Sequence, residues 1–72
     1  MTHKDKILSR VAKHLTSLRE EQGISIRELA ARSNLEYSQV QRIQKGKVNF
    51  AYTTLIALAD GLNISPSKLL DF

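Results

Sequence analysis

The sequence predicts an all-α fold of five helices, and three local patterns support this. Between residues 5 and 22, apolar side chains recur every three to four residues, the period of a helix with one buried face. Ser25 and Glu28 have the spacing of a capping box, which marks the start of a helix. Ser65 followed by Pro66 is typical of an N-cap and the first helical position.

The first helix is expected from about Asp5 to Gln22. Gly23 ends it, since glycine readily adopts the left-handed C-cap conformation, and Ile24 supplies the apolar contact that often accompanies such a cap. The apolar stripe of this helix consists of Ile7, Leu8, Val11, Ala12, Leu15 and Leu18.

Residues 25–46 predict two short helices joined by a tight turn. The turn falls at Ser33-Asn34, because asparagine tolerates the left-handed backbone that a sharp helix-to-helix turn needs. The second helix has Val40 and Ile43 on its apolar side. The side chains on the opposite side are polar or basic, with no acid: Ser38, Gln41, Arg42 and Lys45. A short helix with such a face suits the major groove of DNA.

A loop over residues 47–51 leads to a fourth helix, expected at about residues 52–62 and ended by Asn63. The fifth helix is short and runs through Leu70. The strongest apolar positions of all the helices predict one shared core: Leu15, Leu18, Leu29, Val40, Ile43, Leu55, Leu58 and Leu62.

This pattern resembles the Xre family of helix-turn-helix regulators, which includes phage repressors, Cro and the small controller proteins of restriction–modification systems. The resemblance covers roughly residues 7–70. Beyond the motif it rests on Leu18-Arg19, Gly23 to Ser25, Gly46 to Phe50, Thr54-Leu55, Leu58-Ala59, Leu62 to Ser65 and Leu69-Leu70. It implies a lambda-repressor-like fold with residues 1–72 as a single domain and the helix-turn-helix at about residues 25–46.

The implied function is that of a sequence-specific regulator of transcription, which binds an inverted-repeat operator in double-stranded DNA as a homodimer. The residues that the resemblance places at base edges are Tyr37, Ser38, Arg42 and, less centrally, Gln41. The residues expected at DNA phosphates are Ser25 and Ile26, through their backbone N–H groups, together with Arg27, Gln39, Lys45, Lys47 and Asn49. Packing within the protein remains an alternative for Tyr37, and a phosphate or acid contact remains one for Arg42.

Three positions depart from the family pattern. Ile26 stands where a polar residue often grips a phosphate, so only the backbone can do so here. In the family, a glutamate commonly occupies the position of Gln44 and pairs with an arginine at the position of Arg19. In this chain, Gln44 can form a hydrogen bond with Arg19 but not an ion pair. Ala51 replaces the usual Ser or Thr cap of the fourth helix, a loss that costs about 0.5–2 kcal/mol.

The charge distribution agrees with a nucleic-acid partner. The net charge is +4. Residues 1–47 contain ten Lys and Arg and five Asp and Glu, whereas residues 48–72 contain one Lys and two Asp. The basic half is thus the half that contains the motif, as a surface facing phosphates requires.

Composition argues against enzymes, cofactors and membranes. There is no cysteine, and neither His3 nor His14 has the spacing of a metal-binding motif. No glycine-rich phosphate loop occurs, and no apolar run approaches the ~20 residues that a membrane helix needs. We therefore expect no catalytic residues, metal or cofactor, and a bacterial or phage-encoded protein of the cytoplasm.

Apolar residues near the C-terminal end predict self-association. Ile56 falls off the main stripe of its helix, and Phe72 is a large apolar residue at the end of the sequence. With Leu69, they are the expected dimer contacts. The alternative function is an antitoxin-type module that binds and silences a toxin, and the resemblance leaves RNA polymerase or a toxin open as a further partner.

Overall fold

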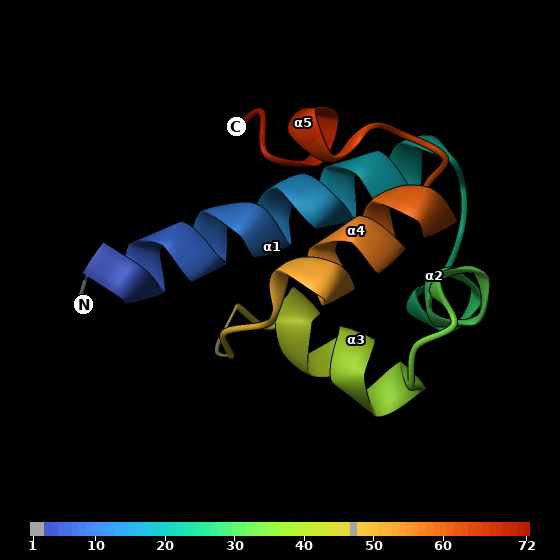
Figure 1. The fold of residues 1–72 in the computed structure, drawn as a ribbon, viewed down its shortest axis with the longest axis horizontal. Helices are drawn as coiled ribbons and strands as arrows, with labels where there is room; N and C mark the ends of the chain where they lie inside the picture. The colour runs from blue at the N-terminus through green and yellow to red at the C-terminus, as the bar shows by residue number, and fades with distance from the viewer. Residues whose placement is uncertain (1–2, 47) are drawn as a thin grey trace.

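Five helices make up the described part of the chain, residues 3–46 and 48–72, in this computed structural model. They are α1 (His3–Glu21), α2 (Ile26–Ser33), α3 (Tyr37–Gln44), α4 (Tyr52–Gly61) and α5 (Pro66–Leu69) (Figure 1). The predicted all-α fold is confirmed, and the helix ends differ from the expected ones by at most about two residues. None of the helices in the described ranges is both long and apolar enough to cross a membrane.

The helix ends are set by the residues that the sequence singled out. Ser25 Oγ accepts a hydrogen bond from the Glu28 N–H at 3.0 Å, as in the capping box. Asn34 ends α2 with a φ of 57°, in the left-handed region. Gly46 follows α3 with a φ of 70°. Ala51 is the N-cap of α4 and provides no side-chain hydrogen bond to it.

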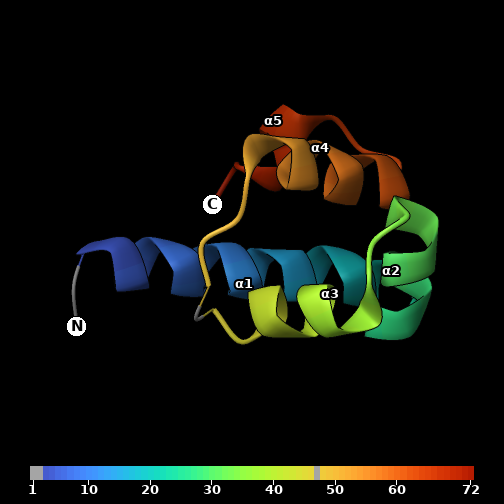
Figure 2. The same ribbon diagram turned by 60° about the horizontal axis from the view of Figure 1, so that its bottom comes forward.

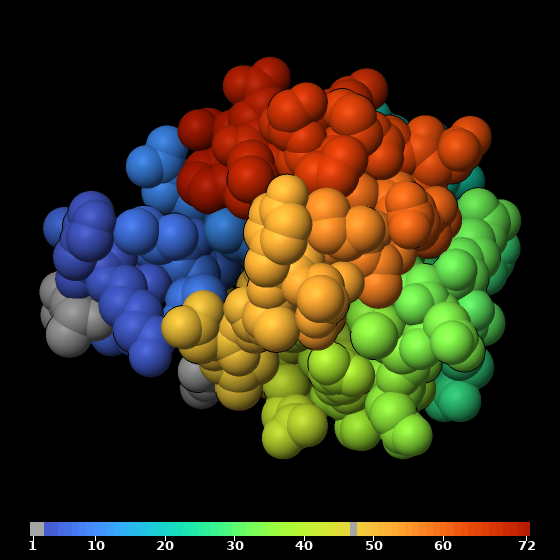
Figure 3. All heavy atoms as spheres, in the orientation of Figure 1, coloured from blue at the N-terminus to red at the C-terminus, as the bar shows by residue number. Residues whose placement is uncertain are grey.

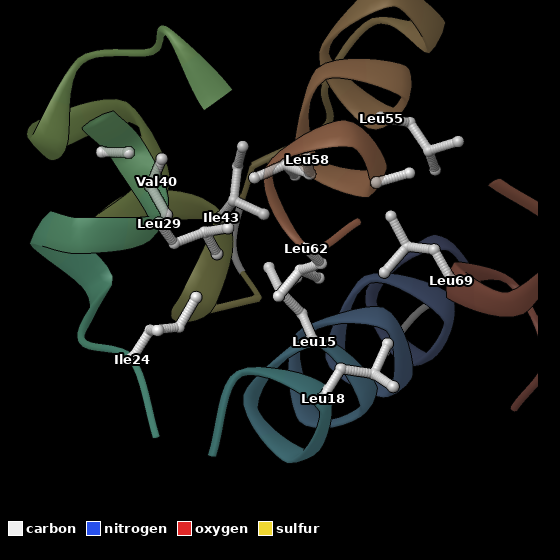
Figure 4. Packing of buried hydrophobic residues seen from close by; sticks show 12 residues of the cluster. Leu15, Leu18, Ile24, Leu29, Val40, Ile43, Leu55, Leu58, Leu62 and Leu69 are labelled. Atoms are coloured by element: carbon white, nitrogen blue, oxygen red, sulfur yellow. The ribbon is translucent and has the colours of Figure 1, made fainter. Parts of the chain in front are cut away.

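The core lies between the helix pair α2–α3 and the other three helices (Figure 4). All eight predicted core residues are buried, and Leu15, Leu29 and Leu62 are fully enclosed. Ile7 is the exception in the predicted stripe of α1, because 41% of its surface is exposed. The first turns of α1 extend past the other helices (Figure 1), which agrees with this exposure.

The helix-turn-helix is held to the body of the protein by a close contact between α2 and α4. Gly61 lies on this contact: a Cβ at this position would collide with Ser33 Oγ and lie 3.3 Å from Leu29 Cδ1. Ser33 is itself buried, and its hydroxyl has no hydrogen-bond partner among the described residues. The absence of a side chain at Gly61 therefore sets how closely the two helices approach.

Candidate nucleic-acid interface

The outer face of α3 is polar and accessible, as predicted. Val40 and Ile43 are at most 2% exposed, while Ser38, Arg42 and Lys45 lie on the surface. Gln41 is half-buried at the edge of this face. Figure 2 shows α3 along one edge of the molecule, beside α1 and next to the start of α2. A surface helix in this position can enter a groove without obstruction by the rest of the chain.

On one flank of α3, the start of α2 forms a shallow basic hollow. Ser25, Ile26, Arg27 and Tyr37 line it, and its volume is about 380 Å³. The backbone N–H groups of Ile26 and Arg27 belong to the first helical turn, where helix geometry supplies no acceptor. The Ile26 side chain packs against the core, so this position offers an anion only its backbone.

On the other flank, an open groove of about 720 Å³ separates α3 from the segment leading into α4. Gln39 and Arg42 line one wall, and Asn49 and Thr54 line the other. The Asn49 side chain is exposed, and its Oδ1 accepts a hydrogen bond from the Phe50 N–H at 3.1 Å. Its amide NH₂ group has donors left for a ligand. Lys47, the remaining expected phosphate contact, lies outside the described residues.

A hydrogen-bonded cluster joins α3 to α1 and fixes the direction of α3. Arg19 Nε donates to Gln44 Oε1 at 3.1 Å, which confirms the hydrogen bond expected in place of an ion pair. Arg19 Nη1 also donates to the Ile24 carbonyl at 2.9 Å. Gln44 Nε2 in turn donates to the Ala12 carbonyl and to Thr16 Oγ1, both at 3.0 Å. Two of the five N–H donors of Arg19 are therefore used within the protein, and its side chain also lines the hollow at the start of α2.

The cations of this surface have no acidic partner within the described residues. Arg32, on the far end of α2, forms an ion pair with Glu28 at 2.9 Å, and both side chains are about half exposed. Arg27, Arg42 and Lys45 outnumber the one acid beside α3, Glu36, which lines the same groove as Arg42. The excess of positive charge favours an anionic ligand.

Lys13, which no sequence pattern singles out, lines with Lys45 a hollow of about 410 Å³ between α1 and the end of α3. The two lysines are 32 positions apart, so only the packing of α1 on α3 brings them together. Among the described residues, there is no cluster of three or more His, Asp or Glu that could hold a metal ion.

The expected dimer contacts need one correction. Leu69 is only 1% exposed and packs in the core of the single chain, so it offers no surface to a partner. Leu70, the next residue, is 48% exposed instead. The sequence pattern shows that one of the two leucines faces inward, but the packing of α5 decides which one.

Phe72 and, at the start of α4, Tyr52 are exposed aromatic side chains that do not line the groove beside α3. Phe72 is 42% exposed, and its ring lies 5.2 Å from the Arg10 guanidinium carbon. Tyr52 is 71% exposed, and Ile56, one helical turn later, is half-buried. The start of α4 and the C-terminal segment lie next to each other in both Figure 2 and Figure 3.

Comparison with known proteins defines the class to which this chain belongs. The profile of a family described as Helix-turn-helix (HTH_3) matches residues 15–69, which include all of α2, α3 and α4. The chain therefore belongs to this helix-turn-helix family and is a DNA-binding transcriptional regulator; the family is one of regulators and not of enzymes.

Among solved structures, the chain is similar to controller proteins of restriction–modification systems. The controller protein C.AhdI from Aeromonas hydrophila is 32% identical and superposes with a TM-score of 0.83, over 86% of this chain and 94% of that one. A point mutant of the controller protein C.Esp1396I is 26% identical with a TM-score of 0.83, over 90% of this chain and 84% of that one. Wild-type C.Esp1396I, at 24% identity and a TM-score of 0.85 over 99% and 88% of the two chains, shows the same fold.

These similarities confirm the resemblance derived from the sequence. No curated protein matches the sequence significantly.

Proposed function

We propose that residues 1–72 form one DNA-binding domain that acts as a homodimer on an inverted-repeat operator, with α3 of each subunit in the major groove. The observation that carries this proposal is the outer face of α3, which is free of acids and flanked by a polar or basic hollow on each side. Two-fold symmetry would place the two copies of α3 about 34 Å apart, one turn of DNA. The activity is regulatory, without catalysis or cofactor, in the cytoplasm of a bacterium or of a phage-infected cell.

Base reading is assigned to the start and the middle of α3. Arg42 is exposed and lies one turn after Ser38, so its guanidinium can reach the O6 and N7 atoms of a guanine. Tyr37 stands at the first position of α3, the end that enters the groove. Gln41 lies at the edge of the face and provides a secondary contact.

Phosphate binding is assigned to the two flanks of α3. At the start of α2, the free backbone N–H groups and Arg27 suit one DNA strand. Across the groove, Asn49 and Gln39 are assigned to phosphates of the other strand. Lys47 is assigned to the same strand from the sequence alone. Lys45 and Lys13 extend the positive charge toward α1.

The direct test is a salt titration of duplex binding. We expect the affinity to fall with a log–log slope steeper than about −4 for the dimer, since each phosphate contact contributes about −0.9. Between about 50 and 200 mM salt, this slope corresponds to a loss of roughly 250-fold. Lys68→Ala, on α5, is the control and should leave the slope unchanged. A flat response of the wild type would contradict the proposed DNA surface.

The apolar surface around Tyr52 and Phe72 is proposed as the dimer contact. A chain of 72 residues buries a limited core and gains from association. Tyr52 and Phe72 are 71% and 42% exposed, and Leu70 is 48% exposed. Exposed aromatic anchors are typical of a self-complementary interface, and none of these three residues lines the groove or the hollow that borders α3.

Replacing Tyr52 or Phe72 by alanine should weaken the dimer about fivefold or more, because each change removes an aromatic anchor. Analytical ultracentrifugation of the free protein measures the effect. Tyr37→Ala is the matched control, since Tyr37 also occupies the first position of its helix but lies beside α2. If the wild type remains monomeric at high micromolar concentration and still binds DNA normally, the dimer proposal is wrong.

The same apolar surface supports one alternative, an antitoxin-type module with a toxin protein seated on it. The two functions differ in what the purified chain does alone. A dimer that binds DNA supports the regulator, whereas a monomer that ignores DNA and binds one protein partner supports the alternative.

A further inference from the structure

A contact between α2 and α3 links a phosphate-facing arginine to the residue at the base-reading end of α3. The Arg27 guanidinium carbon lies 4.4 Å from the centroid of the Tyr37 ring, within the range of a cation–π contact. Arg27 is in the first turn of α2, and Tyr37 is the first residue of α3. The contact therefore spans the two helices of the motif at the end that faces DNA.

The Tyr37 side chain is partly open to solvent. The residue is 37% exposed, so it is not a core side chain with neighbours on all sides. Glu36, the N-cap of α3, makes no side-chain hydrogen bond to the helix. The other arginine of this hollow, Arg19, is bound to Gln44 and to the Ile24 carbonyl. Arg27 is thus the residue whose planar, cationic group covers the ring.

We propose that Arg27 is a positioning residue for base recognition: by stacking on Tyr37, it fixes the direction of the phenol ring and so sets the preference at the base pair that Tyr37 meets. This inference rests on the proposed function. It adds to the phosphate contact expected of Arg27, because a positive charge alone would serve a phosphate, whereas only the flat guanidinium can stack face to face on the ring and hold its direction.

The variant Arg27→Lys distinguishes the phosphate contact of Arg27 from its role in positioning Tyr37. Lysine keeps the charge, so the salt slope should stay within about 0.3 of the wild-type value. It lacks the guanidinium plane, so the preference at one operator position in each half-site should fall about two- to fivefold, the equivalent of an exposed cation–π contact. Selection from a randomised duplex library measures the preference.

Two further variants make the test specific. In a Tyr37→Ala background, Arg27→Lys should cause no additional change in preference, since the ring that it positions is gone. Arg32→Lys is the matched control: it makes the same change on the last turn of α2, where the arginine pairs with Glu28 and has no contact with Tyr37. Its sequence preference should equal that of the wild type.

The proposal is overturned if Arg27→Lys selects the wild-type operator unchanged, or if its effect persists without Tyr37. It is equally overturned if Arg27→Lys weakens all sequences by the same factor, because Arg27 is then a phosphate contact alone. Failure of the proposed function looks different, since the wild-type protein itself would then select no operator.

Discussion

Replacing Gly61 by alanine is expected to lower the free energy of unfolding by about 1–2 kcal/mol, although alanine is the better helix former. The added methyl group meets Ser33 Oγ and lies 3.2 Å from the Ser33 backbone nitrogen, so α2 and α4 must move apart. For a domain of this size, 1 kcal/mol corresponds to roughly 4–8 °C in the melting temperature. Thermal and urea unfolding, followed by circular dichroism, measure the loss.

Ser33→Ala makes this test specific. Alone, it removes a buried hydroxyl that has no partner among the described residues, and we expect stability to stay the same or rise by up to about 1 kcal/mol. Combined with Gly61→Ala, it should recover at least about half of the loss, as coupled neighbours do. Gly23→Ala is the control, because a Cβ there meets nothing within 4 Å and the cost comes only from its left-handed φ of 67°. Ser33→Ala should not rescue that variant.

Arg42→Ala and Lys45→Ala should impair DNA binding in different ways. Loss of Arg42 should cost about 1–3 kcal/mol and relax the preference at one operator position in each half-site, since the change removes the proposed bidentate contact to guanine. Loss of Lys45 should weaken all sequences alike and reduce the salt slope by about one unit per subunit. Selection from a randomised duplex library, together with salt titrations of both variants, distinguishes the two patterns.

Stability serves as the control for both variants. Both side chains are exposed and point away from the core, so the melting temperatures should barely change. If the operator selected by Arg42→Ala equals that of the wild type at every position, Arg42 is a phosphate contact. Base reading then belongs to Tyr37, Ser38 and their neighbours.

The features that the sequence predicted well are those decided within a few residues. Ser25, Asn34 and Gly46 set helix ends through their own side chains and backbone preferences, so their roles could be recognised without knowledge of the fold. The buried stripe of α1 and the polar face of α3 follow from helical periodicity in the same way. The Arg19–Gln44 hydrogen bond was predictable because the family pattern pairs these two positions.

The features that the sequence could not predict depend on how helices meet. Leu69 and Leu70 differ in burial because α5 turns one of them inward. Ile7 has the spacing of a core residue but lies where α1 extends past its neighbours. The stack of Arg27 on Tyr37 joins two helices whose relative orientation local patterns do not give.

The junction between α1 and α3 should keep its geometry over a wide range of acidity. The partner of Arg19 is the neutral amide of Gln44, and its other acceptor is a backbone carbonyl. Neither group gains a proton in mild acid, and a charge–dipole contact is less weakened by dissolved ions than an ion pair is. A carboxylate at position 44 would give up this connection on protonation. In this chain, added salt should therefore weaken the proposed phosphate contacts while α3 remains aligned on α1.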